Sequence, residues 1–336
     1  MSSWPIYRGT GIPHDGIAEL PDPPNWRNFF GEPVIDGNWP HADPSLQRRL
    51  GVLNGRVPSQ KELELVNAAL HLRRPLLVTG HPGVGKSTLA YTVAHELGLG
   101  PVLRWPITTR STLREGLYHY DPIGRLREEN LRRIRGGDTP SEEDDIGRHI
   151  RLGPLGTALL PYRRPRVLLI DEIDKSDIDL PNDLLNVFEE GEFEIEELSR
   201  LPAEIDIVDV MTADKDAARV RRGVVRCRAF PFVVLTSNGE REFPGPFLRR
   251  YIRLDIQPPD AQQLAAILEA QLGSEAAASA TEQISDFIAK RDSGDLLTTD
   301  QLLNAVYLAT SAGVGRSLDD VADSFALSAV LRPLSQ

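Results

Sequence analysis

Short apolar runs alternate with segments of helical periodicity between residues 51 and 257. The apolar runs, each suited to a buried strand, are PLLVTG (75–80), PVLRWPI (101–107), RVLLI (166–170), PFVVLTSN (231–238) and YIRLDI (251–256). Helical patterns occur in SQKELELVNAALHLRR (59–74), STLAYTVAHELG (87–98) and DLPNDLLNVFEE (179–190). Since strands that alternate with helices form a parallel sheet covered on both faces, this pattern predicts an α/β domain.

Three other segments of the chain have different patterns. Residues 1–50 are rich in Pro, Gly and aromatic residues and predict an irregular arm, whereas the alternation of apolar and charged residues in 192–228 predicts β-hairpins or a small sheet. After Gln257-Pro258-Pro259 the periodicity is helical throughout, so a small all-helical domain is expected at 258–336. The aromatic residues of the arm either hold it on a neighbouring subunit or only pack on its own domain: Trp4, Trp26, Phe29, Phe30 and Trp39.

Composition narrows the class of protein. The 336 residues carry a net charge of −11, which disfavours non-specific binding to nucleic acid phosphates. The single cysteine, Cys227, allows neither an internal disulfide nor a thiolate zinc cluster, as is typical of a reducing compartment. We see no secretory leader and no apolar run long enough to span a membrane, and we therefore expect a cytoplasmic protein.

The stretch GHPGVGKS (80–87) fits the pattern G-x-x-x-x-G-K-[ST] and lies between a predicted strand and a predicted helix. Such a loop turns backbone N–H groups toward phosphates, its lysine reaches the β- and γ-phosphates, and its Ser87 hydroxyl is suited to Mg²⁺. The alternative is an ordinary glycine-rich turn. The nucleotide-binding residues that we expect here are Gly80, Gly83, Val84, Gly85, Lys86, Ser87 and Thr88.

Acidic and amide side chains follow two of the other predicted strands. Asp171 ends an apolar run and is suited to hold Mg²⁺, mainly through water, while Glu172 is suited to activate the attacking water. Thr236 and Asn238 end the next strand, where a neutral amide can help to position that water. The alternatives are two solvated acids at a strand end and, for Asn238, a simple turn residue.

A pair of arginines, Arg249 and Arg250, follows in FPGPFLRRYIRLD. A planar cation at the edge of a subunit can stabilise the transition-state charge in the site of a neighbour. A surface salt bridge is the alternative interpretation.

The order of these motifs resembles that of an AAA+ ATPase, and the stretches GPLGTALLP, RVLLIDEIDKSDIDLPNDLL and FPFVVLTSNGEREFPGPFLRRY resemble the MoxR-like branch over about 51–336. The resemblance implies an αβα sandwich with a five-stranded parallel sheet, a helical lid, and ATP with Mg²⁺ bound between the subunits of a ring, commonly a hexamer. It makes Asp171 and Glu172 the Walker B pair and Asn238 the sensor 1 residue. The trans-acting finger is first Arg250 and second Arg249.

The same resemblance implies remodelling or maturation of a partner complex, with a protein substrate or an adaptor such as a von Willebrand A domain protein. The arginines of the hairpin region would then meet an acidic partner segment, unless they form a solvated strand face: Arg219, Arg221, Arg222, Arg226 and Arg228. One departure from the family pattern is the lid helix around LLTTDQLLNAV, which lacks the usual sensor 2 arginine; Arg316 lies elsewhere in the lid.

Three other functions remain open from the sequence. The first is an ATP-controlled assembly switch or scaffold in a bacterial conflict or stress system. The second, disfavoured by the negative charge, is a nucleic-acid translocase. The third is a small-molecule kinase, which would leave the arginine pair and the lid without a role.

Overall fold

Five parallel strands form the central sheet. The computed structural model describes residues 4–37, 39, 58–134, 146–293 and 297–311. The strands of this sheet lie in the order β11-β1-β10-β5-β2, so that β10 separates β1 from β5. Their bounds are β1 Leu76–Thr79, β2 Leu103–Pro106, β5 Val167–Asp171, β10 Phe232–Ser237 and β11 Ile252–Asp255. All five predicted apolar runs are therefore neighbours in one sheet.

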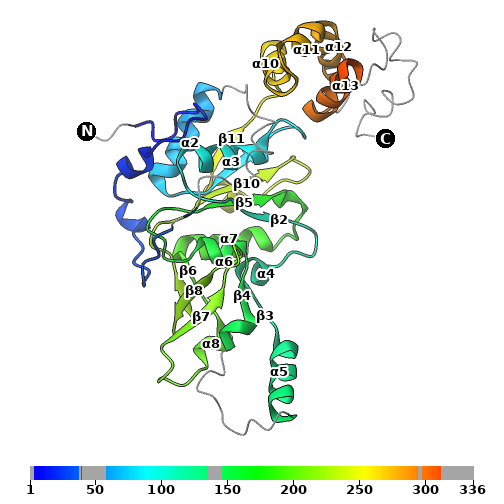
Figure 1. The fold of residues 1–336 in the computed structure, drawn as a ribbon. Helices are drawn as coiled ribbons and strands as arrows, with labels where there is room; N and C mark the ends of the chain where they lie inside the picture. Colours follow the sequence, from blue (N-terminus) through cyan, green and yellow to red (C-terminus); the bar gives the residue numbers. More distant parts are fainter. Residues whose placement is uncertain (1–3, 38, 40–57, 135–145, 294–296, 312–336) are drawn as a thin grey trace.

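Helices cover both faces of the sheet (Figure 1). Successive residues of a strand point to opposite faces, and in β5 Leu168 packs in one hydrophobic cluster and Leu169 in the other. The helices that cover the sheet are α2 Gln60–Leu72 and α3 Lys86–Glu96 on one face, and α4 Leu113–Leu117, α6 Pro154–Ala158 and α7 Leu180–Glu190 on the other. This arrangement confirms the predicted αβα sandwich.

A second sheet of six strands lies beside α6 and α7, on the side away from α2 and α3 (Figure 1). Its order is β3-β4-β7-β8-β9-β6, with bounds β3 Tyr118–Tyr120, β4 Ile150–Leu152, β6 Glu192–Glu194, β7 Ile207–Met211, β8 Ala217–Arg221 and β9 Val224–Arg226. Four of these strands lie in the predicted β-rich stretch, but β3 and β4 come from an earlier segment that the sequence did not indicate.

Shorter elements complete this part of the chain. The alternating run after β6 ends early, because α8 Glu196–Ser199 begins there and turns Leu198 into the core. The helix α5 Pro122–Ile134 projects from the end of the second sheet that is farthest from the central sheet, and η3 Ile146–His149 leads into β4 (Figure 1). The short elements beside the central sheet are η4 Ile173–Lys175 and α9 Gly245–Leu248.

The helices that follow β11 have a hydrophobic cluster of their own, built around Leu264, Leu268 and Phe287. Their bounds are α10 Ala261–Leu272, α11 Ser274–Ser279, α12 Thr281–Asp292 and α13 Thr299–Ser311. Asp260 begins α10 through a reciprocal capping box with Gln263. The last predicted helical segment, with Arg316, lies outside the described residues, and the proposed domain boundaries stay a prediction.

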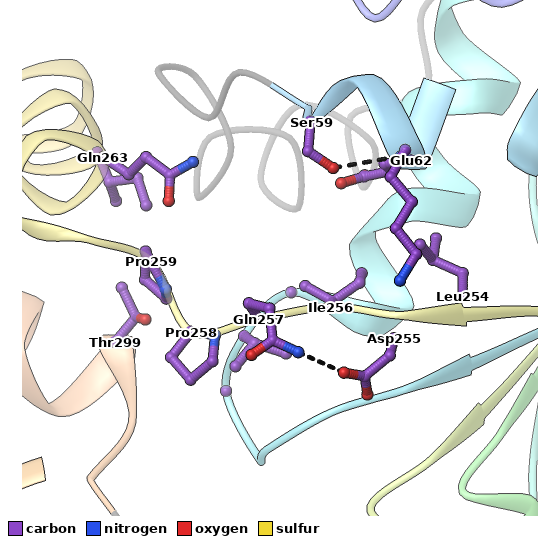
Figure 2. A pocket seen from close by; sticks show the side chains of 15 residues that line it. Ser59, Glu62, Leu254, Asp255, Ile256, Gln257, Pro258, Pro259, Gln263 and Thr299 are labelled. Carbon is purple, nitrogen blue, oxygen red and sulfur yellow. Dashed lines mark hydrogen bonds between the residues drawn. The ribbon is translucent and has the colours of Figure 1, made fainter. Parts of the chain in front are cut away.

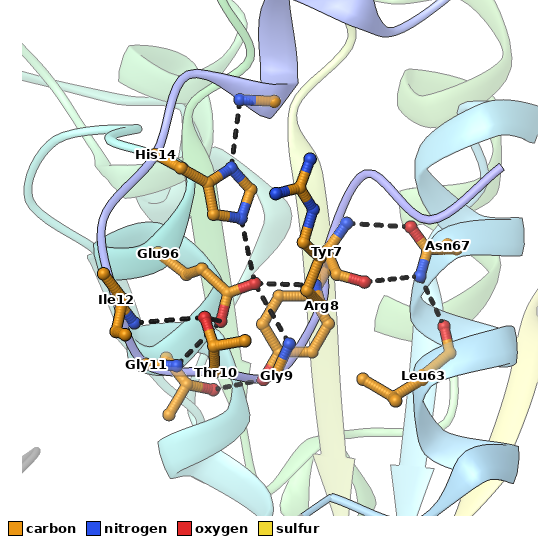
Figure 3. A network of polar contacts seen from close by, with 12 residues as sticks. Tyr7, Arg8, Gly9, Thr10, Gly11, Ile12, His14, Leu63, Asn67 and Glu96 are labelled. Atoms are coloured by element: carbon orange, nitrogen blue, oxygen red, sulfur yellow. Dashed lines mark hydrogen bonds and ion pairs between the residues drawn. The ribbon is translucent and has the colours of Figure 1, made fainter. Parts of the chain in front are cut away.

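The N-terminal arm packs along α2 and α3 with little regular structure beyond η1 Gly16–Glu19 and η2 Asn25–Arg27. The side chain of Glu96, which is fully buried, accepts hydrogen bonds from the backbone N–H groups of Arg8 (2.6 Å), Gly9 (3.0 Å) and Gly11 (2.9 Å) (Figure 3). It also contacts Nε2 of His14 at 3.2 Å. A single carboxylate at the C-terminal end of α3 therefore holds residues 8–14 of the arm, and Asn67 of α2 holds Tyr7 just before them.

The aromatic residues of the arm divide into two groups. Trp4 stacks on His71, Phe29 on Phe230, and the ring of Trp39 lies 4.5 Å from the guanidinium of the buried Arg166. Trp26 and Phe30 are 79% and 69% exposed. Three of the five aromatic side chains thus pack on the chain's own domain. Within the described ranges, no helix has both the length and the apolar character needed to cross a membrane.

Candidate functional site

The loop between β1 and α3 depends on its glycines. Gly80, Gly83 and Gly85 have φ angles of +146°, +78° and +89°, which side-chain-bearing residues rarely adopt. A Cβ on Gly83 would also lie 2.6 Å from the side chain of Thr298 beside the lid helices. Since α3 begins directly after Gly85, its first N–H groups lack intrahelical partners and form an anion-binding helix terminus.

Lys86 folds back over this loop. Its Nζ donates to the carbonyl oxygens of Gly80 (2.8 Å) and His81 (2.9 Å), and the residue is only 7% exposed. Burial lowers the pKa of Lys86, against the nearby charges of Asp174, Asp171 and Glu172, which raise it. The ammonium group is therefore held inside the loop by weak neutral acceptors that an anionic oxygen can replace.

Asp171 joins the ends of three elements. Its Oδ1 accepts hydrogen bonds from Ser87 Oγ on α3 (2.6 Å) and from Thr236 Oγ1 on β10 (2.8 Å). Its Oδ2 accepts from Nε and Nη2 of Arg104 on β2, at 3.1 and 2.7 Å. Burial disfavours the charged form, but the hydrogen bonds from Ser87, Arg104 and Thr236 outweigh it and hold the pKa of Asp171 below its ordinary value. Asp171 is therefore a buried carboxylate that is kept ionised.

The donor set at this point fits Mg²⁺. A hydroxyl that donates its hydrogen to a carboxylate keeps its oxygen lone pairs for a cation, and Ser87 does so toward Asp171. Over the described ranges, no cluster of three or more His, Cys, Asp or Glu side chains could hold a metal ion by itself. Because Mg²⁺ in phosphate sites takes one or two protein oxygens and completes its shell with water and phosphate, Ser87 and Asp171 would suffice.

Arg104 was missed in the sequence analysis. It interrupts the apolar run PVLRWPI, and Leu103 and Trp105 on either side of it are 3% and 5% exposed. A charged residue inside a buried-strand pattern signals a specific partner, because an unpaired charge there is costly. The position of Arg104 in the sequence therefore indicates a buried partner, but the pairing of β2 with β5 is needed to identify that partner as Asp171.

Glu172 has an unusual backbone conformation. Its φ and ψ are +63° and +52°, a left-handed conformation that is uncommon for a residue other than glycine. Its N–H donates to Thr236 Oγ1 at 2.8 Å, which ties the turn to β10. Its carboxylate forms an ion pair with Lys175 Nζ at 2.9 Å, and the two side chains are 44% and 40% exposed. The backbone places this carboxylate directly after Asp171, and the role of Glu172 as a water-activating base stays a prediction.

Asn238 ends β10 beside β5, but its side chain points to Glu240 (Nδ2 to Oε1, 3.4 Å). The backbone N–H groups of Asn238 and Glu240 donate to Asp174 Oδ2 at 2.8 and 3.2 Å. Asp174 thus organises the loop after β10. The sensor 1 role of Asn238 stays a prediction.

A pocket of about 180 Å³ adjoins the loop (Figure 2). It lies between the start of α2 at Ser59, the loop at Val84, the end of β11 at Ile256, and the lid helices α10 and α13. Its lining mixes apolar residues such as Val84 and Ile256 with polar residues such as Ser59, a mixture that suits a flat ring system attached to bound phosphates. No local pattern in the sequence indicates this pocket, because its lining comes from segments that lie far apart along the chain.

Arg250 and Arg249 follow α9 and differ in their surroundings. Arg250 forms an ion pair with Glu189 on α7, and their side chains are 42% and 41% exposed. Arg249 is exposed. Among the described residues, neither arginine forms an ion pair with Asp171 of the candidate metal site. The buried ring of Tyr251 anchors the chain directly after them.

The arginines of the second sheet are largely neutralised within the chain. Arg221 and Arg222 both contact Asp206, at 2.8 and 2.7 Å, and Arg226 pairs with Glu192. Arg219 lies 3.8 Å from Asp209. These pairs favour the solvated strand face over a dedicated site for an acidic partner. The helix α13 contains most of the segment in which no sensor 2 arginine was found, and that departure stays a prediction.

A comparison with known families bears on this site. A family model described as an AAA domain (dynein-related subfamily) matches residues 75–204, a stretch that contains the glycine loop, Arg104 and the Asp171-Glu172 pair. The match supports an AAA+ ATPase, as expected from the order of the motifs. It ends before Asn238, Arg249 and Arg250, and it does not distinguish the MoxR-like branch.

Proposed function

We propose that this chain is a ring-forming AAA+ ATPase of the MoxR-like type, which couples the hydrolysis of Mg-ATP to the remodelling or maturation of a partner protein complex. The observation that carries the ATPase part is the 2.6 Å hydrogen bond between Ser87 and Asp171. It joins the first turn after the glycine loop to the end of β5, so phosphate-binding and metal-binding groups share one point of the sheet.

Each residue of the candidate site has a separate role in the proposed hydrolysis. Lys86 exchanges its loop carbonyls for phosphate oxygens, and the N-terminus of α3 holds the same anion. Ser87 and Asp171 would hold Mg²⁺, which supplies charge neutralisation on the phosphates when bound. Glu172 takes the proton of the attacking water, and Asn238 orients that water once its side chain turns from Glu240.

The ring is proposed from the arginine pair. In phosphoryl transfer a cation must neutralise charge that develops on the leaving oxygens. The side chain of Arg250 is partly exposed, and its ion pair with Glu189 is also exposed enough to be exchanged for the site of an adjacent subunit. The resemblance to AAA+ ATPases implies a hexamer, with the nucleotide between neighbouring subunits.

The partner is proposed to be a protein, such as a substrate complex or a von Willebrand A domain adaptor. The second sheet and α5 project away from the loop that binds phosphate, and they offer a surface that the ATPase core does not use (Figure 1). The internal pairing of the hairpin arginines argues against a nucleic-acid path along this surface, because phosphates would have to displace existing partners.

ATP turnover per subunit, measured over a wide range of protein concentration together with the mass of the particle, tests this function. We expect the rate to rise steeply and then level off as rings form. The variant Glu172→Gln should still bind ATP and should lose turnover by at least about 100-fold. A monomer that turns over at the full rate would overturn the shared site. A Glu172→Gln protein that still supports the partner would instead indicate an assembly switch.

A further inference from the structure

Arg104 saturates the carboxylate that is expected to serve the metal. A carboxylate offers about four lone-pair positions, two on each oxygen. In Asp171, Ser87 and Thr236 occupy Oδ1, and the two N–H groups of Arg104 occupy Oδ2. Mg²⁺ in proteins keeps several of its waters, and each such water needs an acceptor. Within this arrangement Asp171 can accept from a metal-bound water only if one of its present donors leaves.

Of the three donors, Arg104 is the one that can leave. Thr236 is buried between β5 and β1 and also accepts the N–H of Glu172, and Ser87 is itself a proposed metal ligand. Arg104, by contrast, belongs to β2 at the edge of the sheet, and its side chain is 44% exposed. Leu103 and Trp105 anchor the strand in the core, so the guanidinium can move into water without disturbing the backbone.

Charge favours the same exchange. The bidentate Arg104 pair is charge-assisted and compensates a carboxylate that is 91% buried, a state that would be costly without a cation. A divalent ion beside Asp171 would provide that compensation instead, and it would repel a guanidinium placed on the same carboxylate. The two cations therefore compete for one group.

We infer that Arg104 is a displaceable counter-ion of Asp171: it occupies this carboxylate before Mg-ATP binds and is exchanged for the hydrated metal when the site fills. Arg104 is thus a positioning residue that sets the metal affinity of the site. The inference rests on the proposed function, since it takes Ser87 and Asp171 as the groups that hold Mg²⁺.

The test measures metal binding directly. Mn²⁺, as a spectroscopic substitute for Mg²⁺, is titrated into the full chain with a non-hydrolysable ATP analogue, and free Mn²⁺ is followed by its electron paramagnetic resonance signal. We expect Arg104→Gln to tighten Mn²⁺ binding about tenfold, a coupling typical of groups in direct contact. Arg114→Gln removes a comparable exposed arginine, paired with Glu197 at 2.8 Å, and should leave binding unchanged.

Further variants keep the test decisive. In an Asp171→Asn background, Arg104→Gln should change Mn²⁺ binding less than about twofold, because the two residues act through one another. Arg104→Lys keeps one cation and loses the bidentate geometry, so its Mn²⁺ affinity should fall between those of the wild type and Arg104→Gln; it decides the matter if the glutamine variant does not fold. Unchanged or weaker Mn²⁺ binding in Arg104→Gln and Arg104→Lys, each compared with the wild type, would overturn the inference.

Nucleotide binding and Mn²⁺ binding distinguish a failure of the counter-ion inference from a failure of the proposed function. Binding of the ATP analogue to the wild-type chain is measured first, with and without Mn²⁺. A wild-type chain that binds no nucleotide contradicts the proposed function. A wild-type chain that binds nucleotide and Mn²⁺ normally, with Arg104 variants that match it, contradicts only the counter-ion role.

Discussion

Lys175 holds the carboxylate of Glu172 at 2.9 Å, three residues along the same turn. Both side chains are partly exposed, so the ion pair is of the kind that contributes at most about 1 kcal/mol. The proposed base is therefore restrained by a weak contact with its own chain. A restraint of this size is easily exchanged when water and nucleotide enter the site.

Lys175→Gln should free Glu172 and raise ATP turnover modestly. The expected increase is at most about fivefold, since the lost contact is worth no more than about 1 kcal/mol. Steady-state ATP hydrolysis at saturating nucleotide measures it, with Lys290→Gln on the exposed end of α12 as the control. A loss of turnover greater than about tenfold would show that Lys175 takes part in the reaction rather than restraining it.

Arg250→Ala should lower turnover by about 10³-fold and leave ATP binding intact, as expected for a finger that acts only on the transition state. Arg249→Ala, at the adjacent exposed position, should have a much smaller effect. Nucleotide affinity and turnover are measured for each variant. If Arg249→Ala has the larger effect, the two roles are reversed.

Mixing of two inactive variants tests whether the finger acts in trans. Subunits with Arg250→Ala keep Glu172, and subunits with Glu172→Gln keep Arg250, so mixed rings should regain part of the turnover that neither variant shows alone. Glu189→Gln releases Arg250 from its intrachain partner and should keep or increase the wild-type rate. Mixed rings that stay inactive at every ratio would contradict a shared site.

Glu96→Ala should loosen the N-terminal arm. The change leaves the N–H groups of Arg8, Gly9 and Gly11 without their charged acceptor, and we expect a loss of about 3 kcal/mol in the free energy of unfolding. Early proteolysis at Arg8 should accompany it. Denaturant unfolding measures the effect, and the exposed Glu64→Ala serves as a control that should change stability by less than about 0.5 kcal/mol. Equal stability of the two variants would mean that the arm is held elsewhere.

Cys227 should be inert in the folded chain. Its side chain is fully buried, and burial raises the pKa of the thiol to about 12, so at pH 8 only about one molecule in 10⁴ carries the reactive thiolate. A thiol reagent should therefore label one cysteine per chain in guanidinium chloride and almost none in native buffer. Rapid native labelling would contradict the burial of this residue.

The strands and helices of the central sheet follow from the sequence because their signals are local. An apolar run such as RVLLI is typical of a strand buried on both faces, and Asp171 at the end of such a strand lies at the carboxyl edge of the sheet. The glycine loop is equally local, since Gly80, Gly83 and Gly85 have the positive φ angles that their spacing suggests.

The remaining features depend on contacts between distant segments. The strands β3 and β4 are only three residues long, too short to show a period, and they are defined by pairing with each other and with β7. The partner of Arg104 is separated from it by 67 residues, and that of Arg250 by 61. A charge in the sequence shows that a partner is needed, but only the fold shows which one.

The helix α3 carries the phosphate loop at one end and Glu96 at the other. Its 11 residues make a rod about 16 Å long, and its buried side is fixed in the core. A displacement of residues 8–14 would therefore act on the same helix that begins at the glycine loop. The arm is thus positioned to couple a contact made outside the central sheet to the glycine loop at the opposite end of α3.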